Sequence, residues 1–416
     1  MNTSTYFLSK KKLIERKQYM QRLRGLRDHN IIKVITGVRR CGKSTLLQMF
    51  ADELRQTGVS EEQIQFYNFE DPDVYNLGNW KEIYDHIKVR LVPDKMNYLF
   101  LDEVQHVDIF QRLVDGLFIK KNCDVYITGS NAALLSGELA TLLTGRYIEF
   151  SILPFQFVEY YDFALFNSPN LSKVEGLGNY ALEGGIPEYW NQKRIGQDDA
   201  DDFVRGVLNT IVEKDIFQRL NVKEKHDFNK IIDFVFDSVG SFVSLRSISN
   251  TLRTHGTVVD HKTVGKYLDA LCEAFLLYKA PRYEIKGKGL LQTLNKYYLV
   301  DPCFRKVRVK RSMQKEITHW LENVVYFELL RRNRDVYVGK IGDKEVDFVV
   351  TDREGYTLYY QVAWTTMIPE ILERELAPLK AIKDSNPKYL LTTDFDGDPV
   401  YNGIRKLNVA NWLLGK

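Results

Sequence analysis

Short apolar runs recur along residues 31–152 and alternate with segments of helical periodicity. The runs are IIKVIT at 31–36, IQFYNF at 64–69, NYLFLD at 97–102, DVYITGS at 124–130 and YIEFSI at 147–152. The intervening segments, such as STLLQMFADELRQ, repeat apolar residues every three or four positions. Strands that alternate with helices and are apolar on both faces predict a parallel sheet covered by helices on both sides.

The pattern changes after Pro154. An aromatic helical segment, FQFVEYYDFALF, is followed by a polar loop and a Gly-Gly-Ile-Pro-Glu turn at 184–188, which predicts a helical lid or connector. Residues 226–280 predict several short helices and then a hairpin. Strand-like runs return from about residue 290 (KYYLV, DVYVGKI, EVDFVV, LYYQVAW, KYLLTT) around a helix at 317–332, which predicts a second α/β module.

Length and composition indicate a soluble protein of several domains. The 416 residues exceed one ordinary core, and 44% hydrophobic with 27% charged residues is typical of globular proteins. No apolar run reaches the roughly 18 residues of a membrane span, and the amino terminus lacks a signal core. We therefore expect a cytoplasmic protein with no membrane contact. The cysteines show no CxxC spacing, which favours reduced thiols over disulfides or a zinc site at Cys41, Cys123, Cys272 and Cys303.

A glycine-rich segment lies between the first predicted strand and the first amphipathic helix. It matches GxxxxGK[ST] in full and is followed by Thr45; its residues are Gly37, Val38, Arg39, Arg40, Cys41, Gly42, Lys43 and Ser44. In a P-loop of this kind the backbone N–H groups and the helix start face the phosphates. Lys43 then contacts the β and γ oxygens, and the Ser44 hydroxyl ligates Mg²⁺. The segment predicts a nucleoside triphosphate site, for ATP with Mg²⁺.

Two acids end the predicted strand at 97–102. Asp102 is expected to hold the Mg²⁺ shell, and Glu103 to polarise the attacking water. Acidic pairs are common at strand ends, so the P-loop is what makes this pair a catalytic candidate.

Two further side chains are candidates for contact with the phosphates. Asn131 follows the next strand, where it either senses the γ-phosphate or caps the helix that follows. Arg146 carries a guanidinium suited to stabilise the transferring phosphate, in cis or from a neighbouring subunit. A surface salt bridge is the alternative for Arg146.

With these motifs, the chain resembles bacterial and archaeal ATPases that join an AAA-type domain, AAA_14, to a carboxy-terminal DUF4143 region. The matching stretches are ITGVRRCGKSTLL, YLFLDEVQ, ITGSNAALLSGELATLLTGRYIEFSILPFQFVEY, GGIPEYW, residues 244–280, and LENVVYFELLRRN with EVDFVV. The resemblance implies an α/β chain with an AAA-like P-loop NTPase core, a helical lid, a winged helix and a module similar to PD-(D/E)XK nucleases. We expect these at 1–160, 161–225, 226–285 and 286–416.

The winged-helix segment offers a face to DNA. Val264, Leu268 and Leu271 fall on one side of a predicted helix, which leaves His261, Lys262 and Lys266 on another. Such a helix grips DNA in helix-turn-helix proteins, with residues 278–283 as a basic wing. Few cations lie on this face, so a protein-docking or lid role is the alternative.

Whole-chain charge is only +3 and does not indicate a nucleic-acid binder, but local charge is more informative. Residues 1–40 contain many Lys and Arg with only Glu15 and Asp28 as acids. A second basic run comprises Arg305, Lys306, Arg308, Lys310, Arg311 and Lys315. Either run contacts phosphate backbone or forms a solvated surface.

The nuclease resemblance is incomplete at its active site. Glu322 and Asp347 match the first two acids of the PD-(D/E)XK pattern, but the third and fourth positions hold Gln361 and Ala363, where intact members of the family have Glu and Lys. Because alanine cannot orient or activate water, we predict that the hydrolytic centre is dismantled.

The leading hypothesis is a Mg²⁺-dependent ATPase whose cycle repositions the winged helix and the nuclease-like module on DNA or a protein partner, alone or as a homo-oligomer. An ATP-dependent nuclease and a nucleotide-switched scaffold with negligible hydrolysis are the alternatives. Ala363 argues against the first, and Glu103 beside Asp102 argues against the second.

Overall fold

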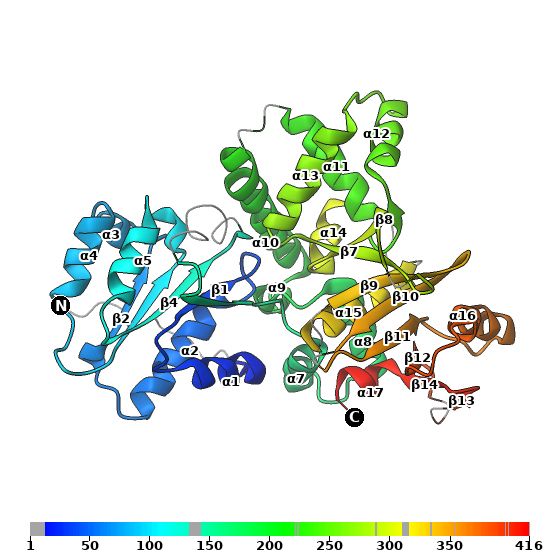
Figure 1. The fold of residues 1–416 in the computed structure, drawn as a ribbon, viewed down its shortest axis with the longest axis horizontal. Coiled ribbons are helices and arrows are strands. Elements are labelled where there is room, and N and C mark those ends of the chain that lie inside the picture. Colours follow the sequence, from blue (N-terminus) through cyan, green and yellow to red (C-terminus); the bar gives the residue numbers. More distant parts are fainter. Residues whose placement is uncertain are drawn as a thin grey trace.

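The computed structural model describes residues 13–132, 143–220, 222, 224–287, 289–309, 316–332, 335–352, 354–395, 397 and 399–415. Two sheets organise the chain, one of five strands near the amino terminus and one of nine strands near the carboxy terminus. In Figure 1 the five-stranded core lies on the left, the nine-stranded sheet on the right, and α9 and α10 between them. The predicted α/β fold with a P-loop core is confirmed.

The amino-terminal core is a parallel sheet in the order β2-β3-β4-β1-β5. Its strands coincide with the predicted runs: β1 Ile32–Thr36, β2 Ile64–Asn68, β3 Asn97–Asp102, β4 Cys123–Gly129 and β5 Tyr147–Ser151. Helices that flank it are α1 Lys17–Leu26, α2 Lys43–Gln56, α3 Pro72–Tyr75, α4 Trp80–Lys88 and α5 Phe110–Phe118. Alternate strand residues enter two different apolar clusters, so both faces of the sheet are buried, as the apolar strands predict.

A helical segment follows the core, where the lid was predicted. It comprises α7 Phe157–Asn167, α8 Lys173–Glu183, α9 Pro187–Lys193 and α10 Gln197–Thr210, and α10 continues as a π-helix over Ile211–Gln218. The next elements have the order of a winged helix: α11 Lys225–Asp237, β6 Phe242–Val243, α12 Leu245–Thr254, α13 His261–Glu273, β7 Leu277–Glu284 and β8 Gly289–Leu299.

The β7–β8 hairpin is also part of the carboxy-terminal sheet. That sheet runs β13-β14-β12-β11-β10-β9-β7-β8-β6, and β7 pairs in parallel with β9. The domain boundary expected between residues 285 and 286 therefore lies in the turn of the β7–β8 hairpin, which belongs to the carboxy-terminal sheet and follows α13 directly. The remaining elements are α14 Pro302–Arg308, α15 Ile317–Arg332, β9 Asp335–Ile341, β10 Lys344–Thr351, β11 Thr357–Val362, α16 Pro369–Ala381, β12 Lys388–Thr392, β13 Val400–Tyr401, β14 Ile404–Asn408 and α17 Val409–Leu413.

The turn at 184–188 is held by buried contacts from two distant segments. Asp301, at the start of α14, accepts a hydrogen bond from Gly185 N at 2.7 Å, and Phe155 N donates to Gly185 O at 2.8 Å. A Cβ on Gly185 would lie 2.3 Å from Phe155 O, and one on Gly184 would lie 1.7 Å from the Asp301 carboxylate. Glycine is therefore the residue that fits at this junction of core, lid and carboxy-terminal module.

Gly185→Ala should destabilise the protein by about 1–3 kcal/mol, because the new methyl group meets backbone that cannot move away. Gly25→Ala is the matched control. Gly25 lies in α1 with open space around it, so alanine there should be neutral or slightly stabilising. Thermal unfolding of the three proteins followed by circular dichroism checks this. Equal midpoints for Gly185→Ala and the unsubstituted protein would contradict the packing argument.

Candidate functional site

The P-loop adopts a curled backbone between β1 and α2. Gly37 has φ +146°, and a Cβ there would lie 2.2 Å from Ile152 O. Arg40 and Gly42 both have left-handed backbone, with φ of 66° and 103°. Helix α2 begins at Lys43 without a side-chain cap. Its first N–H groups and its positive dipole end are thus presented to an anion, as the motif predicts.

The Lys43 ammonium lies inside the site against the tip of β3. It donates to Gly37 O at 3.0 Å and lies 3.3 Å from Glu103 Oε1, with 4% of the side chain exposed. Burial by itself lowers the pKa of Lys43, but the nearby acidic groups, Glu103 first and then Cys41 and Asp102, together outweigh it and the pKa is raised. Burial would likewise raise the pKa of Glu103, yet Lys43 holds it below its usual value. The two side chains form a buried ion pair.

Asp102 lies beside this pair and contacts both neighbouring strands. The Thr128 hydroxyl of β4 donates to Asp102 Oδ1 at 2.6 Å and accepts from Glu103 N at 2.9 Å. Burial raises the pKa of Asp102, while hydrogen bonds from Ser44 and Thr128 act in the opposite direction. Ser44 and Asp102 are therefore within contact of each other, as a shared cation would require.

A cavity of about 1250 Å³ opens over these residues. Its core side includes Arg39, Arg40, Gly42, Lys43, Ser44, Thr45, Asp102 and Glu103. Its opposite wall is formed by the lid and includes Pro187, Glu188, Gln192, Phe203, Thr210 and Lys214. Residues of the P-loop core and of the helical segment at 187–214 therefore line the same cavity.

A smaller cavity of about 240 Å³ lies on the other side of Gly42 and Thr45. Pro187 and Glu188 border both cavities. The apolar side chains around the smaller one come from four segments and are Leu13, Ile14, Met49, Phe155 and Phe163. Arg16 also lines this cavity. Its guanidinium donates to Cys41 O at 3.3 Å and pairs with Glu159 at 3.0 Å, which connects the P-loop to α7.

Two predicted residues lie outside the larger cavity. Asn131 Nδ2 donates to Asp215 O of the π-helix at 3.2 Å. Arg146 pairs with Asp115 of α5 at 2.5 Å and has 45% of its side chain exposed. Neither residue lines the cavity, so the expected action of Arg146 in cis is not supported by its position. In the structure Arg146 forms a surface salt bridge with Asp115, which was the alternative interpretation.

Several residues of the site could not be recognised in the sequence. Lys214 and Thr210 line the phosphate cavity from the lid, and Asp215 pairs with Arg39 of the P-loop at 2.8 Å. They lie far from the P-loop in the sequence and match no motif. In this part of the site, the sequence predicted only the Gly-Gly-Ile-Pro-Glu turn that contains Glu188. It did not indicate that this turn would line the phosphate cavity.

The carboxy-terminal module brings Glu322 and Asp347 together, as the nuclease resemblance implies. With Glu345 they place carboxylate oxygens within 4.8 Å of one another. Lys296 of β8 enters this group, 2.8 Å from Glu322 and also paired with Glu345. The acids are thus compensated by a lysine from the hairpin, a residue that the sequence pattern did not identify.

Gln361 and Ala363, the two positions that depart from the nuclease pattern, are both buried at the end of β11 of this sheet. Gln361 Oε1 accepts from Asp347 N at 3.3 Å, and its amide donates to Glu375 at 3.1 Å. Ala363 is 3% exposed. Burial raises the pKa of Asp347 well above its usual value, and the charge of Glu322 adds to that rise.

The basic segments have different surroundings. His261, Lys262 and Lys266 are exposed on α13, which the Asp260 side chain caps. The second basic run is not a free cationic surface where it is described: Arg305 is fully buried against Asp237, and Arg308 pairs with Asp233. Lys306 pairs with Glu183. All three residues thus have carboxylate partners within the protein, and phosphate contact by this run stays a prediction. Lys310, Arg311 and Lys315 lie outside the described residues.

Comparison with known protein families supports the AAA-type assignment of the amino-terminal core. Residues 29–161 match the AAA domain family AAA_14, and residues 174–324 match a domain of unknown function, DUF8612. The expected DUF4143 relationship stays a prediction. A Walker-type ATPase of Pyrococcus abyssi covers 71% of this chain and 95% of its own at 15% identity and a TM-score of 0.48. Among the described residues, no helix has the length and apolar character needed to cross a bilayer.

Two relatives match along most of their length. A protein of Methanocaldococcus jannaschii, described as uncharacterized, is 28% identical over 370 residues, which cover 85% of this chain and 79% of its own. A protein of Haemophilus influenzae with the same description is 38% identical over 407 residues, which cover 97% of this chain and 99% of its own. The chain therefore belongs to the same family as the Haemophilus influenzae protein and carries an AAA-type P-loop ATPase core.

Proposed function

We propose that this protein binds ATP with Mg²⁺ and hydrolyses it at the P-loop. The observation that carries the proposal is the buried contact of Lys43 with Glu103, on the wall of a cavity that also exposes Ser44 and Asp102. A cation for phosphate, an acceptor for a water proton and two oxygen ligands for a metal thus converge within one space.

The oxygen donors fit Mg²⁺ rather than a softer metal. Ser44 offers a hydroxyl and Asp102 a carboxylate, and Mg²⁺ is bound in proteins by one or two such groups together with substrate phosphates. Burial makes ionised Asp102 costly by itself, so a neighbouring cation would stabilise its charged form. When bound, the metal would neutralise charge that develops on the β and γ oxygens.

The residues of this chain account for the remaining steps. Lys43 exchanges its bonds to Gly37 O and Glu103 for phosphate oxygens, which leaves the Glu103 carboxylate ready to accept a proton from the attacking water. Gln105 donates to Glu103 Oε2 at 2.6 Å and fixes its orientation. The lid wall excludes bulk water from the cavity and contributes Lys214 as a further cation.

The smaller cavity is suited to the base of the nucleotide. It adjoins the phosphate cavity at Gly42 and Thr45, and its apolar side chains Ile14, Met49 and Phe163 match the flat faces of a purine. Asn191 and Gln48 on its border supply hydrogen-bonding groups for the ring edge.

The cycle is proposed to act on DNA or a protein partner through the α11–α13 segment. The exposed cations of α13 are the feature that helix-turn-helix proteins present to phosphate backbone. Protein docking is the alternative for this face. An ATP-dependent nuclease is disfavoured, because Ala363 carries no functional group at the fourth position of the nuclease pattern and Gln361 replaces the acid at the third.

Lys43→Ala should reduce ATP hydrolysis by about a hundredfold or more and weaken nucleotide binding, because it removes the buried cation of the phosphate site. A phosphate-release assay with calorimetric measurement of nucleotide affinity checks this. Unchanged turnover in the variant would end the assignment of the P-loop.

Glu103→Gln should keep Mg-ATP bound while hydrolysis falls by about 10²-fold or more, because the amide keeps the shape but cannot accept the water proton. Affinity and single-turnover hydrolysis are measured on the same preparation. If affinity collapses while turnover persists, Glu103 supports Lys43 structurally and another residue activates the water.

The purified protein should not cleave DNA in Mg²⁺ or Mn²⁺, because Ala363 leaves no lysine to activate water at the fourth position of the nuclease pattern. Incubation with circular and linear duplexes, followed by electrophoresis, tests this against Asp347→Ala as the matched variant. Metal-dependent cleavage that Asp347→Ala abolishes would establish the nuclease alternative.

Reversal of Lys262 and Lys266 to Glu should lower DNA affinity by a similar factor for all sequences and leave basal hydrolysis intact, because these residues contact phosphate without reading bases. The salt dependence of log affinity should lose about one unit of slope per lost contact. The matched control reverses Lys88 and Lys95, which are exposed on the ATPase core, and so makes the same change in net charge. Fluorescence anisotropy over a salt series is the measurement, and equal affinity of both double variants would favour protein docking.

A further inference from the structure

Arg39 connects the P-loop to the π-helix of the lid. Its guanidinium forms a two-point contact with Asp215, at 2.8 Å from Nε and 3.0 Å from Nη2, and its third nitrogen contacts Glu70 at 2.7 Å. The Arg39 and Asp215 side chains are 11% and 9% exposed. Such a bidentate, nearly buried pair is directional and much less screened than a surface ion pair.

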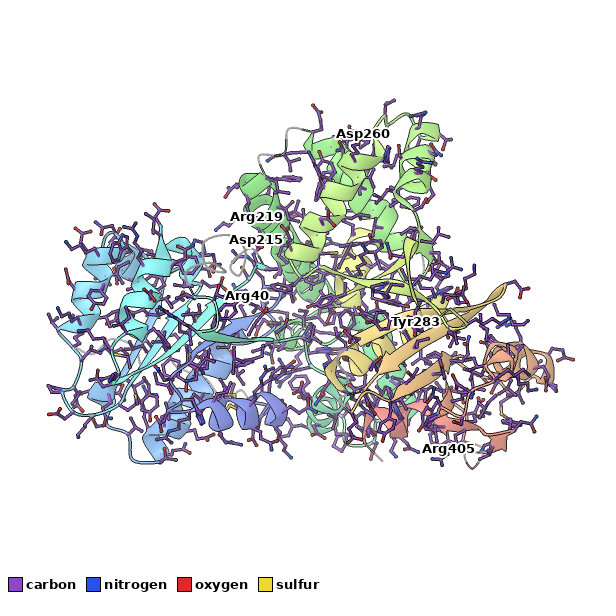
Figure 2. All side chains as sticks on the ribbon, viewed as in Figure 1. Arg40, Asp215, Arg219, Asp260, Tyr283 and Arg405 are labelled. Carbon is purple, nitrogen blue, oxygen red and sulfur yellow. The ribbon has the colours of Figure 1, made fainter. Side chains whose placement is uncertain are left out.

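Asp215 gathers contacts from three parts of the molecule. Its carboxylate binds Arg39 of the P-loop, while its carbonyl accepts from Asn131 at the end of β4 and from Arg219 Nε at 3.1 Å. Arg219 then pairs with Glu273, the last residue of α13. In Figure 2, Arg40, Asp215 and Arg219 follow one another from the core toward the α11–α13 segment, and Asp260 marks the far end of α13.

The backbone at this point is a π-helix over Ile211–Gln218, which interrupts the α-helical register of α10. Short π segments within α-helices occur frequently at functional sites. Lys214, the residue before Asp215, lines the phosphate cavity. This stretch of helix therefore lines the phosphate cavity with Lys214 and contacts the P-loop with Asp215. Arg219, one turn further on, contacts Glu273 of α13.

From these contacts we infer that Asp215 is a positioning residue that relays nucleotide occupancy of the P-loop to α13. The inference rests on the proposed function. A γ-phosphate beside Lys43 competes with Asp215 for the Arg39 guanidinium. When Asp215 loses Arg39, the helical turn that carries Asp215 becomes less constrained. The bond from Arg219 to the Asp215 carbonyl and the Arg219–Glu273 pair are then weakened. By reciprocity, a ligand that holds α13 changes the affinity of the P-loop for nucleotide by the same factor.

Hydrogen exchange of the full-length protein, with and without a nonhydrolysable ATP analogue and Mg²⁺, tests the relay. The nucleotide should speed exchange in the carboxyl-terminal half of α13 by about fivefold or more, the lower end of ordinary coupling between sites. Asp215→Asn should show fast exchange there without nucleotide and no further response. Glu213→Gln is the matched control: Glu213 lies on the same π-helix but pairs with Lys225, so the variant should respond like the unsubstituted protein.

Glu273→Gln separates the relay from the nucleotide site, because Glu273 lies at the end of α13 and outside the cavities. Calorimetry should find that nucleotide binding is retained and tightened by up to the coupling factor of about fivefold, while the exchange response of α13 is lost. If the unsubstituted protein binds nucleotide but α13 does not respond, or if Asp215→Asn still responds, the relay is overturned and the proposed ATPase stands. Failure of the unsubstituted protein to bind nucleotide would overturn both.

Discussion

The buried ion pair of Lys43 and Glu103 is the interaction on which the arrangement of the core depends. A lone ammonium or carboxylate would be very costly at this depth, so each requires the other when no phosphate is present. The two residues come from the P-loop after β1 and the tip of β3, which are separated by β4 in the sheet. Thr128 of β4 therefore bridges Asp102 and Glu103 by hydrogen bonds, and the tips of three strands are fixed in one geometry.

The same requirement for compensated charge explains how the lid is attached. Arg39 is nearly buried and is neutralised by Asp215 of the π-helix, so the lid wall supplies the counter-charge of the P-loop. On the other side of the lid, buried Asp301 satisfies the backbone of the 184–185 turn, and burial raises the pKa of this carboxyl to about 6. The cavity wall is thereby linked both to the phosphate site and to the carboxy-terminal module.

The carboxy-terminal sheet shows how one hairpin serves two modules. Strands β7 and β8 follow α13 and pair with each other, and β7 also pairs in parallel with β9 of the carboxy-terminal sheet. Lys296 lies on this hairpin and pairs with both Glu322 and Glu345.

The sequence by itself determined the parts of this protein that depend on local pattern. Alternating apolar runs predicted all five core strands, since burial on both faces demands continuous hydrophobicity. The P-loop and the acidic strand tip were recognised because their chemistry requires fixed spacing within a few residues. Only the tertiary structure decided which distant charges neutralise one another. It paired Arg305 with Asp237 and Arg146 with Asp115, it brought Lys296 to the acids, and it placed Asp215 against Arg39. Such pairs depend on how separate elements pack, and a charged side chain carries no local signal of the partner it will meet.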